Sequence, residues 1–365
     1  MSGFDVPDFG MSWLDAVGTS ADVVLSTRVR LARNLQGYPF VAKAGPDERE
    51  AVFDAVRRVA RASQLTRHCA CIRMAKIDPH ARRVFMERRL VSSDLVGEGR
   101  PGPHEAAAVI AVFDEPISIM INEEDHLRLQ SLSSGLCIAE AWNLVDRLDE
   151  AIGRELLLAF HPEFGYLTSC PTNTGTGLRA SVLVHLPGLV LTKEIDRVLQ
   201  GLAHMGLTYR GLYGEGSEVV GNFFQISNQT TLGKSEEDLV DHLVRMVDTV
   251  IQTEARARHT LMRDAGPSTE NLIWRAYGLL RYARLLTYKD LMELLSGVRL
   301  GVSLKLLPGP PVYTLNRMMI FSQAAHLDQA AGRELSRPER QAHRASYVRK
   351  VLSDGNEPPT SDPGG

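Results

Sequence analysis

The sequence predicts an α+β module followed by a small all-helical module. Between residues 23 and 229, short runs rich in strand-forming residues alternate with helical stretches. Most of residues 272–352 are helical in pattern. Residues 265–269 read Ala-Gly-Pro-Ser-Thr, a helix-breaking combination that predicts a domain boundary between the two modules. At 365 residues the chain is long enough for both.

Three runs in the first module have strand character. Ile117–Ile121 is mostly apolar and leads into residues 122–128, Asn-Glu-Glu-Asp-His-Leu-Arg. Residues 181–186 and 222–228 also gather strand-forming residues. Between the first two runs, apolar side chains at three- and four-residue spacing predict a helix face: Ala141, Leu144, Val145, Leu148 and Ile152.

A long amphipathic helix is expected to start after Ser235 and to reach about Arg258. Residues 232–235 (Leu-Gly-Lys-Ser) are like the end of a Walker phosphate-binding motif, but position 228 is Asn and the glycine-rich cradle is missing. Acids fill positions 236–238, so we interpret Ser235 as a helix N-cap. Residues 287–290 predict a second capping box, and residues 308–311 (Pro-Gly-Pro-Pro) predict a loop.

The composition narrows the functional class. The formal net charge is −3, so no general attraction to nucleic acid or anionic membranes is expected. We find no secretion signal and no apolar run of membrane-spanning length, and four cysteines are too few for a disulfide scaffold. A cytoplasmic protein with reduced thiols is predicted. The run His68-Cys-Ala-Cys71 has no second ligand pair downstream, so no metal site is expected.

Polar clusters in three expected loops indicate the chemistry. Residues 122–128 and 210–218 supply carboxylates, and residues 165–181 place Cys170 in a glycine-rich turn. A carboxylate pair can clamp a guanidinium and accept its proton while its nitrogen attacks phosphorus. The acids could instead be solvated surface charges, and Cys170 could be a small buried hydrophobe.

Arginines are candidates for binding polyphosphate in the absence of a glycine loop. Arg28 and Arg30 are two residues apart in an extended segment and so face the same side. Arg128, Arg179 and Arg210 fall in the loop clusters. Together they could hold a triphosphate with its Mg²⁺. Any one of them alone is better explained as a surface or ion-paired side chain, and only the five together favour phosphate binding.

The clusters resemble the ATP:guanido phosphotransferase (phosphagen kinase) family over about residues 22–352, and most closely its bacterial protein-arginine kinase branch. The family-like blocks are residues 26–34, 122–126, 169–173 and 178–181, and the blocks typical of that branch are residues 213–218 and 225–234. The resemblance implies an antiparallel sheet flanked by helices, with ATP and Mg²⁺ as cofactors. It also implies catalytic roles for Glu124, Cys170, Glu215 and Glu218.

The same resemblance implies a nucleotide site. Its residues would be Ser26, Thr27, Arg28, Val29, Arg30, Arg89, Arg128, Arg179, Ala180, Ser181, Val182, Leu183, Arg210, Gly211, Leu212, Tyr213 and Gly214. Arg89 stands where the family often has His, and another cation there could still reach a phosphate. Arg340 and Arg344 match an allosteric phosphoarginine site of the branch, in which Gln341 replaces a carboxylate.

The predicted domain limits are an N-terminal segment at 1–21, a catalytic domain at 22–258, a helical domain at 268–352 and a disordered tail at 353–365. Only about 25 residues precede the first arginine block, where metabolic phosphagen kinases carry a sizeable helical domain. The acceptor site is therefore expected to be open, which suits an arginine on a protein surface.

The predicted function is ATP-dependent phosphorylation of arginine on proteins. The alternatives are a kinase of free arginine or another small guanidino compound, and a catalytically silent regulator that binds nucleotide or phosphoarginine. The resemblance implies a zinc-binding activator and a link to stress-related quality control through Clp-type proteolysis. A homodimer is predicted because the helical module has more apolar side chains than one small bundle is expected to bury. They include Leu272, Ile273, Leu279, Leu280, Leu285 and Leu286.

Overall fold

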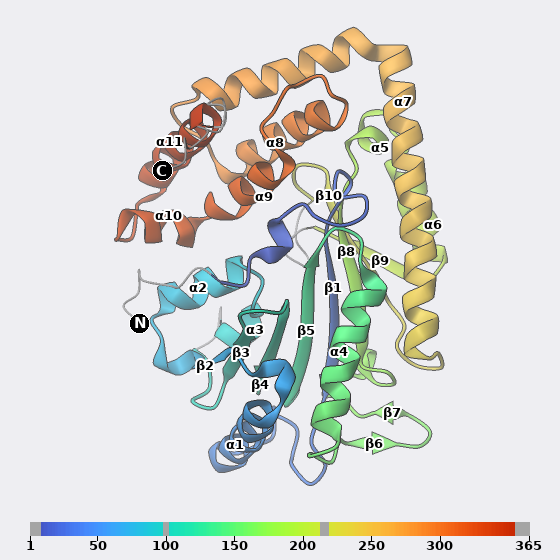
Figure 1. Cartoon of the computed structure of the whole chain (residues 1–365), viewed down its shortest axis with the longest axis vertical. Coiled ribbons are helices and arrows are strands. Elements are labelled where there is room, and N and C mark those ends of the chain that lie inside the picture. Colours follow the sequence, from blue (N-terminus) through green and yellow to red (C-terminus); the bar gives the residue numbers. More distant parts are fainter. Residues whose placement is uncertain (1–8, 98–101, 212–218, 355–365) are drawn as a thin grey trace, which may run out of the picture.

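An eight-stranded antiparallel sheet forms the centre of the molecule (Figure 1). The computed structural model describes residues 9–97, 102–211 and 219–354. Within them the strand order is β2-β3-β4-β5-β1-β8-β10-β9, and β6 and β7 form a separate hairpin. The strands are β1 (Val24–Arg33), β2 (Cys69–Arg73), β3 (Ala108–Val112), β4 (Ile117–Ile121), β5 (Leu127–Ser134), β6 (Phe160–His161), β7 (Gly165–Tyr166), β8 (Leu178–His185), β9 (Leu207–Arg210) and β10 (Phe223–Asn228).

Helices cover the sheet and form a second module at one end of it. They are α1 (Pro46–Ala62), α2 (Pro79–Glu87), α3 (Ser93–Val96), α4 (Ile138–Gly153), α5 (Pro187–Leu191), α6 (Ile195–His204), α7 (Glu236–Tyr282), α8 (Tyr288–Ser303), α9 (Val312–Phe321), α10 (Ala324–Ala331) and α11 (Arg337–Asp354). Short 3-10 turns are η1 (Ser12–Leu14), η2 (Gln64–Thr66), η3 (Met74–Lys76) and η4 (Pro171–Asn173). The predicted α+β class, antiparallel sheet and helical C-terminal region are confirmed.

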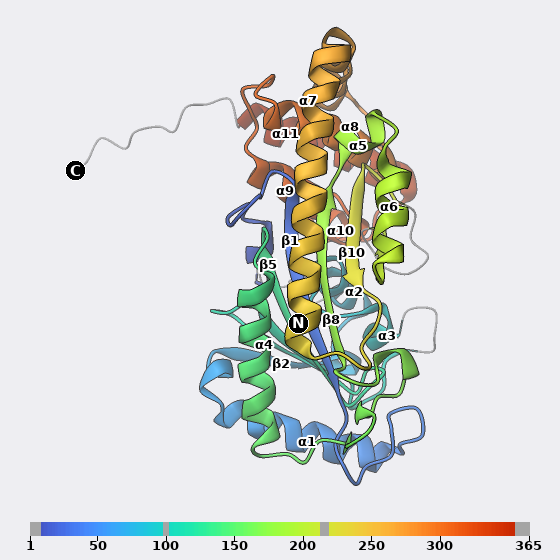
Figure 2. The ribbon, with the colours of Figure 1, turned by 90° about the vertical axis from the view of Figure 1, so that its right-hand side faces the viewer.

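The two faces of the sheet differ in character. Figure 2 shows α4, α7 and α6 side by side across one face, where apolar side chains such as Val29, Leu129 and Val182 are fully buried. Because side chains alternate along a strand, Arg28 and Arg30 in β1 point to the opposite face. The sequence therefore builds one apolar face, packed against helices, and one face that carries arginines.

Helix α7 is longer than predicted. Ser235 caps its start as expected, with Oγ accepting from the Asp238 N–H at 3.1 Å. The predicted break at residues 265–269 is a kink rather than an end, since Ala265 leaves helical geometry and Pro267 lies inside the helix. Proline lacks an N–H and frees a carbonyl of the previous turn. The hydroxyl of Thr269 donates to the Ala265 carbonyl at 2.9 Å, next to the kink. The predicted limits at 258 and 268 both fall within α7, so the domain division stays a prediction.

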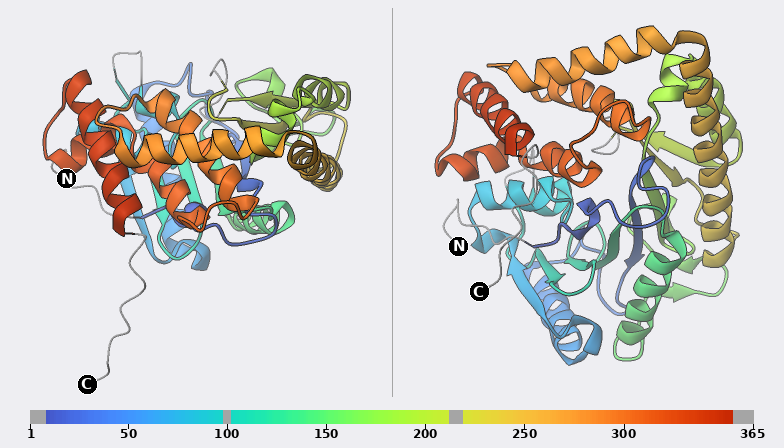
Figure 3. Two further views of the ribbon diagram at one scale, coloured as in Figure 1. Left: turned by 90° about the horizontal axis from the view of Figure 1, so that it is seen from above. Right: turned by 45° about the horizontal axis from the view of Figure 1, so that its top comes forward.

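The helical C-terminal region shares a core with one end of the sheet (Figures 1 and 3). Leu25, Leu183 and Phe223 from the sheet pack in one cluster with Leu291 and Met292 of α8. The expected capping box at Thr287 and the loop at residues 308–311 are both present. No helix in the described part of the chain is long and apolar enough to cross a membrane.

A carboxylate joins α2 to the helical region. Glu87, the last residue of α2, accepts from the N–H groups of Ala325 and His326 at 2.9 and 3.1 Å, at the start of α10. The next residue, Arg88, donates to Nε2 of His326 at 3.3 Å. These buried contacts fix the C-terminal end of α2, from which the chain continues into Arg89.

Candidate active site

Strand register brings the predicted arginines onto one face of the sheet. In β1, Arg30 lies directly between Arg179 of β8 and Gln130 of β5, and Arg28 lies opposite Ser181. Arg128 is two residues from Gln130 and so shares its face. Arg210 of β9 lies opposite Gln225 of β10. We call this surface the arginine face, defined by Arg28, Arg30, Arg89, Arg128, Arg179 and Arg210.

Arg89 reaches the arginine face from outside the sheet. It follows α2 with a left-handed φ of 63°, an uncommon conformation for a residue with a side chain. Its Nη2 donates to Oε1 of Gln225 at 2.7 Å, and its guanidinium lies 5.7 Å from the Trp13 ring centroid. A cation from a distant segment is thus held beside Arg28 and Arg30.

The buried guanidinium groups of the arginine face repel one another. Burial and the neighbouring Arg128 and Arg179 lower the pKa of Arg30 to about 9. Burial and the nearby Arg30 and Arg89 lower the pKa of Arg28 well below its ordinary value. No described residue accepts a hydrogen bond from the buried Nε of Arg30. An anion with several oxygens would relieve the repulsion and provide the missing acceptor.

Two acids stand at the edge of the arginine face. The Glu123 side chain is fully buried and accepts from Nη1 of Arg128 at 2.6 Å. The side chain of Glu124 is 41% exposed and accepts from Nη2 of the same arginine at 2.9 Å. Burial raises the pKa of Glu124, Asp125 and Glu123 add to the rise, and Arg128 opposes it. Burial would lower the pKa of Arg128, but the three acids outweigh it and that pKa is raised.

The loop that carries Cys170 is bound to the backbone of these acids. Ser169 donates from Oγ to the Glu124 carbonyl at 2.8 Å, and its N–H donates to Oδ1 of Asp125 at 2.7 Å. Cys170 is partly buried, and its sulfur lies 3.0 Å from Oγ1 of Thr172. Gly175, at a φ of 116°, lies so close to the Thr231 carbonyl that a Cβ would come within 2.2 Å of its oxygen. The thiol and Glu124 are thus on adjoining, well-fixed segments.

Comparison with protein-family models gives two matches. Residues 51–257 match the ATP:guanido phosphotransferase C-terminal catalytic domain, and residues 268–362 match the protein-arginine kinase McsB C-terminal domain. The chain is 42% identical over 345 residues to a protein-arginine kinase of Pelotomaculum thermopropionicum, covering 94% of this chain and 96% of the relative. A protein-arginine kinase of Symbiobacterium thermophilum is 44% identical, with 93% and 96% covered. The chain belongs to the ATP:guanido phosphotransferase family.

Solved structures of family members share the fold. The crystal structure of a lombricine kinase aligns with a TM-score of 0.58 at 25% identity, covering 69% of this chain and 71% of that one. A duplicated taurocyamine kinase of Schistosoma mansoni aligns with a TM-score of 0.59 at 23% identity, covering 70% of this chain and 35% of that one. Membership of the family makes the chain an enzyme of the guanido phosphotransferase type, which uses a nucleotide.

Some residues that the family resemblance assigned to the nucleotide lie on the apolar face. Thr27, Val29, Ala180 and Val182 are buried there because they alternate with the arginines, so only their backbone could meet a ligand on the arginine face. Ser26 and Leu183 lie opposite one another, and Oγ of Ser26 is buried with no partner among the described residues.

The glycine turn predicted to carry two further acids cannot be placed. Leu212, Tyr213, Gly214, Glu215 and Glu218 lie outside the described residues. Gly211, the last residue described before them, is buried next to Arg210 at the end of β9. The roles given to Glu215 and Glu218 remain predictions.

Sequence reasoning missed several residues of the site. Gln130 accepts from Nε of Arg28 at 2.6 Å, and Gln225 binds Arg89. Ser92, the N-cap of α3, donates to the buried carboxylate of Glu123. The only signal in the sequence is that each glutamine alternates with apolar residues along its strand, and so points to the same face as the arginines.

The two arginines of the predicted phosphoarginine site are engaged within the helical region. Arg340 donates to both oxygens of the buried Asp328 of α10, at 2.9 Å from Nε and 2.5 Å from Nη2. Arg344 is buried and donates to the carbonyls of Ser322 and Leu286, each at 2.8 Å. A phosphate would have to displace some of these acceptors. Phosphoarginine binding by this family member therefore stays a prediction.

Proposed function

We propose that this enzyme is a protein-arginine kinase that transfers the γ-phosphoryl group of ATP to arginine side chains of proteins. The observation that carries the proposal is the junction between the arginine face and the Glu123–Glu124 pair. One side of the junction gathers buried guanidinium groups, among them Arg30, whose Nε has no acceptor among the described residues. The other side offers a carboxylate that is 41% exposed, next to a fixed thiol loop.

The arginine face would bind the phosphates and offset charge that develops on the transferred group. Phosphoryl transfer passes through a loose transition state, so positioning and charge stabilisation provide most of the catalysis. Arg28 and Arg30, from the centre of the sheet, would contact the phosphate chain. The two terminal nitrogens of Arg128 donate to Glu123 and Glu124, so this arginine would connect the nucleotide to the acceptor side.

Glu124 would orient the acceptor guanidinium and take its proton. A guanidinium is protonated below a pH of about 12 and lacks a nucleophilic lone pair. Loss of a proton to the carboxylate, as the nitrogen bonds to phosphorus and the β–γ bridging oxygen leaves with ADP, balances the reaction. Cys170 would sit beside the same cation, with Glu215 and Glu218 as further acids of the site.

Mg²⁺ would enter with ATP. Within residues 9–97, 102–211 and 219–354, no three His, Cys, Asp or Glu side chains are grouped to hold a metal. Mg²⁺ commonly binds nucleotide phosphates and water with few protein ligands, which fits a face made of cations. The ion would neutralise phosphate charge, while the arginines position the same groups.

The exposure of Glu124 favours a protein acceptor over free arginine. An arginine in a polypeptide must reach the carboxylate with its flanking chain outside the site, which requires an open approach. The relatives that match the whole chain carry the name protein-arginine kinase, and residues 268–362 match the C-terminal domain of that group. We therefore place free guanidino compounds and a silent regulatory role second and third.

The direct test is incubation with Mg·ATP and an arginine-rich protein. The product should carry phosphate that is lost in acid and retained in base, as expected for a phosphorus–nitrogen bond. Glu124→Gln should abolish it, and Glu140→Gln, an exposed change of the same kind on α4, should not. A fully active Glu124→Gln enzyme would contradict the role of Glu124. Faster ADP release with free arginine than with protein would favour the second candidate.

The cellular setting is proposed from the family resemblance. We place the enzyme in the cytoplasm, with a zinc-binding activator and Clp-type proteolysis of its phosphorylated targets under stress. A homodimer through the helical region is supported by the exposure of Leu272, Leu279 and Leu285 on its surface; the neighbouring Ile273 and Leu280 are buried. Sedimentation of the full chain would test the dimer, and phosphoproteomics of a deletion strain would test the targets.

A further inference from the structure

Two glutamines connect the arginines of the arginine face. Gln130, in β5, accepts from Nε of Arg28 at 2.6 Å and donates from Nε2 to the carbonyl of Arg89 at 3.0 Å. Gln225, in β10, accepts from Nη2 of Arg89 at 2.7 Å and donates to Oγ of Ser181 at 3.1 Å. Each amide thus accepts from one guanidinium and donates to a fixed neighbour.

These contacts close into a ring. Oγ of Ser181 donates to the carbonyl of Arg28 at 3.4 Å, a long contact that returns the path to its start. The ring therefore runs Arg28, Gln130, Arg89, Gln225, Ser181 and back to Arg28. Gln130 is 1% exposed and Gln225 is 7% exposed, so both amides are shielded from water. Buried hydrogen bonds of this kind hold side chains in one geometry.

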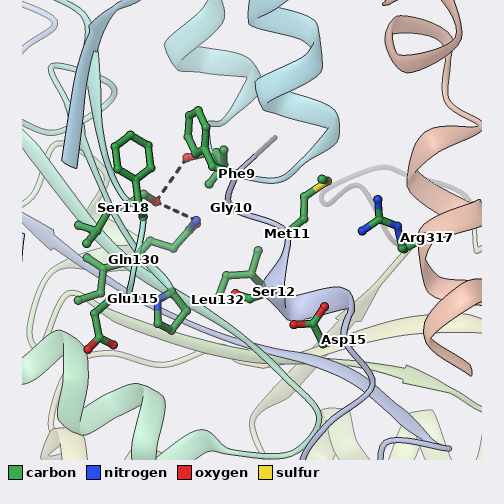
Figure 4. A pocket seen from close by; sticks show the side chains of 15 residues that line it. Phe9, Gly10, Met11, Ser12, Asp15, Glu115, Ser118, Gln130, Leu132 and Arg317 are labelled. Atoms are coloured by element: carbon green, nitrogen blue, oxygen red, sulfur yellow. Dashed lines mark hydrogen bonds between the residues drawn. The ribbon is translucent and has the colours of Figure 1, made fainter. Parts of the chain in front are cut away.

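Gln130 is also fixed from behind. Its Nε2 donates to Oγ of Ser118 at 3.1 Å, and that hydroxyl is 3.5 Å from the Leu90 carbonyl. Figure 4 shows Gln130 and Ser118 joined in this way in the wall of a cavity of about 280 Å³. The amide is therefore oriented by contacts from β4 and from the segment after α2 before any ligand arrives.

The choice of an amide over a carboxylate has an electrostatic consequence. A glutamate at either position would bind its arginine more strongly, but it would also cancel one of the charges that attract phosphate. An amide oxygen accepts from the guanidinium and leaves its positive charge unchanged. Burial and the neighbouring arginines lower the pKa values of Arg28 and Arg30, and a further positive charge kept at this face strengthens its attraction for phosphate.

We propose that Gln130 and Gln225 are positioning residues that aim Arg28 and Arg89 at the nucleotide phosphates while keeping the arginine face positively charged. The ring makes Arg89 part of the same unit as Arg28, although the two come from segments far apart in the sequence. This inference rests on the proposed nucleotide site and adds two residues that act through the arginines.

The test uses a matched pair of substitutions at Gln225 in the full-length protein. Gln225→Glu keeps the size and can still accept from Arg89, and the Ser181 hydroxyl can turn to donate to it. Gln225→Met keeps the length but removes both hydrogen bonds. Gln200→Glu adds the same charge on the exposed side of α6 and serves as the control. Calorimetry with Mg·ADP gives Kd, and thermal unfolding without nucleotide gives Tm.

We expect Gln225→Glu to weaken Mg·ADP binding at least tenfold while its Tm without nucleotide equals or exceeds that of the wild type. Gln225→Met should weaken binding less and lower the Tm, and Gln200→Glu should change neither. If Gln225 had only a structural role, the variant that binds Mg·ADP more weakly would also be the one with the lower Tm. A Gln225→Glu protein that binds Mg·ADP within twofold of the wild type would overturn the inference.

A second variant and the wild type complete the test. If Gln225→Glu does not fold, Gln130→Met decides: an unchanged Kd overturns the inference, and a severalfold weaker one supports it. If the wild type itself fails to bind Mg·ADP, the proposed nucleotide site and this inference both fall. Binding by the wild type together with unaffected glutamine variants would remove this inference alone.

Discussion

The two faces of the central sheet are built from the same strands, but one packs against helices through apolar side chains and the other carries buried arginines. Along β5, Leu129 is fully buried against the helices, while its neighbours Arg128 and Gln130 belong to the charged side. Along β1, Val29 and Leu31 alternate with Arg28 and Arg30 in the same way. One face gains stability from apolar burial, and the other accepts buried charges that lower it.

The contrast shows where the enzyme gives up stability for function. Arginines buried close together are unfavourable in the free protein, and a polyphosphate would compensate them on binding. Removing an arginine of the charged face should therefore weaken ligand binding without lowering stability. Substitutions on the apolar face should do the reverse. The following predictions are ordered by the size of the expected effect.

Arg30→Met should have the largest kinetic effect. It removes a central cation whose Nε has no acceptor among the described residues, so we expect kcat/KM for ATP to fall by about 10³-fold. The Tm without nucleotide should stay the same or rise, because replacing a buried charge by an apolar side chain of similar length is often neutral or stabilising. Steady-state kinetics and thermal unfolding check both halves. A normal kcat/KM would contradict the charged-face assignment.

Leu129→Ala should show the opposite behaviour. The residue is fully buried on the apolar face between Leu31 and Ile119, its neighbours across the sheet. Truncating a buried leucine costs about 2–5 kcal/mol of unfolding free energy. Urea unfolding should show that loss, while KM for ATP stays within twofold of the wild type at a temperature where the variant is folded. A large rise in KM with little loss of stability would contradict the assignment of this face to stability rather than to binding.

Much of this contrast could be predicted from the sequence. The mostly apolar run Ile117–Ile121 predicted a strand, and the spacing of Arg28 and Arg30 predicted a shared side; both are confirmed. Local signals sufficed because strand alternation and helix caps depend on neighbouring residues. Residues 265–269 predicted a break, and Ala265 does leave helical geometry there, but the helix resumes at once and the break is a kink within α7.

Glu124 should set the acid limit of activity. Because burial raises its pKa, the carboxylate becomes protonated, and loses its capacity as a base, at a higher pH than an ordinary glutamate of about 4.3. The pH profile of kcat/KM for a protein acceptor should therefore fall on the acid side at a pH above that value. Glu140→Gln should keep the same acid limb. A limb at or below the ordinary glutamate range would show that another group controls it.

Ser235→Ala should have the smallest effect and separates two ways of binding phosphate. Loss of this helix N-cap should cost about 1 kcal/mol of unfolding free energy. KM for ATP should not change, because we propose that the phosphates bind to the arginine face and not to the Gly-Lys-Ser segment at 233–235. Chemical unfolding and steady-state kinetics measure both quantities. A clear rise in KM would move part of the phosphate site to the start of α7.

The rest of the site could not be predicted because it depends on long-range register. Arg89 reaches the sheet through a left-handed turn after α2, whose end is held by a helix more than 200 residues later in the chain. The pairing of Gln130 with Arg30, and of Gln225 with Arg210, follows from strand order, which no local pattern specifies. The burial of Glu123 could not be predicted either, because it depends on Ser92, which comes from another segment and donates to its carboxylate.

A structure of the full chain with Mg·ADP would test the central claim most directly. The account predicts phosphate oxygens within hydrogen-bond distance of the Arg30 guanidinium, with Arg28 and Arg89 alongside and Glu124 left free toward the acceptor. Phosphates bound elsewhere, with these guanidinium groups unchanged and without contact to the nucleotide, would contradict it.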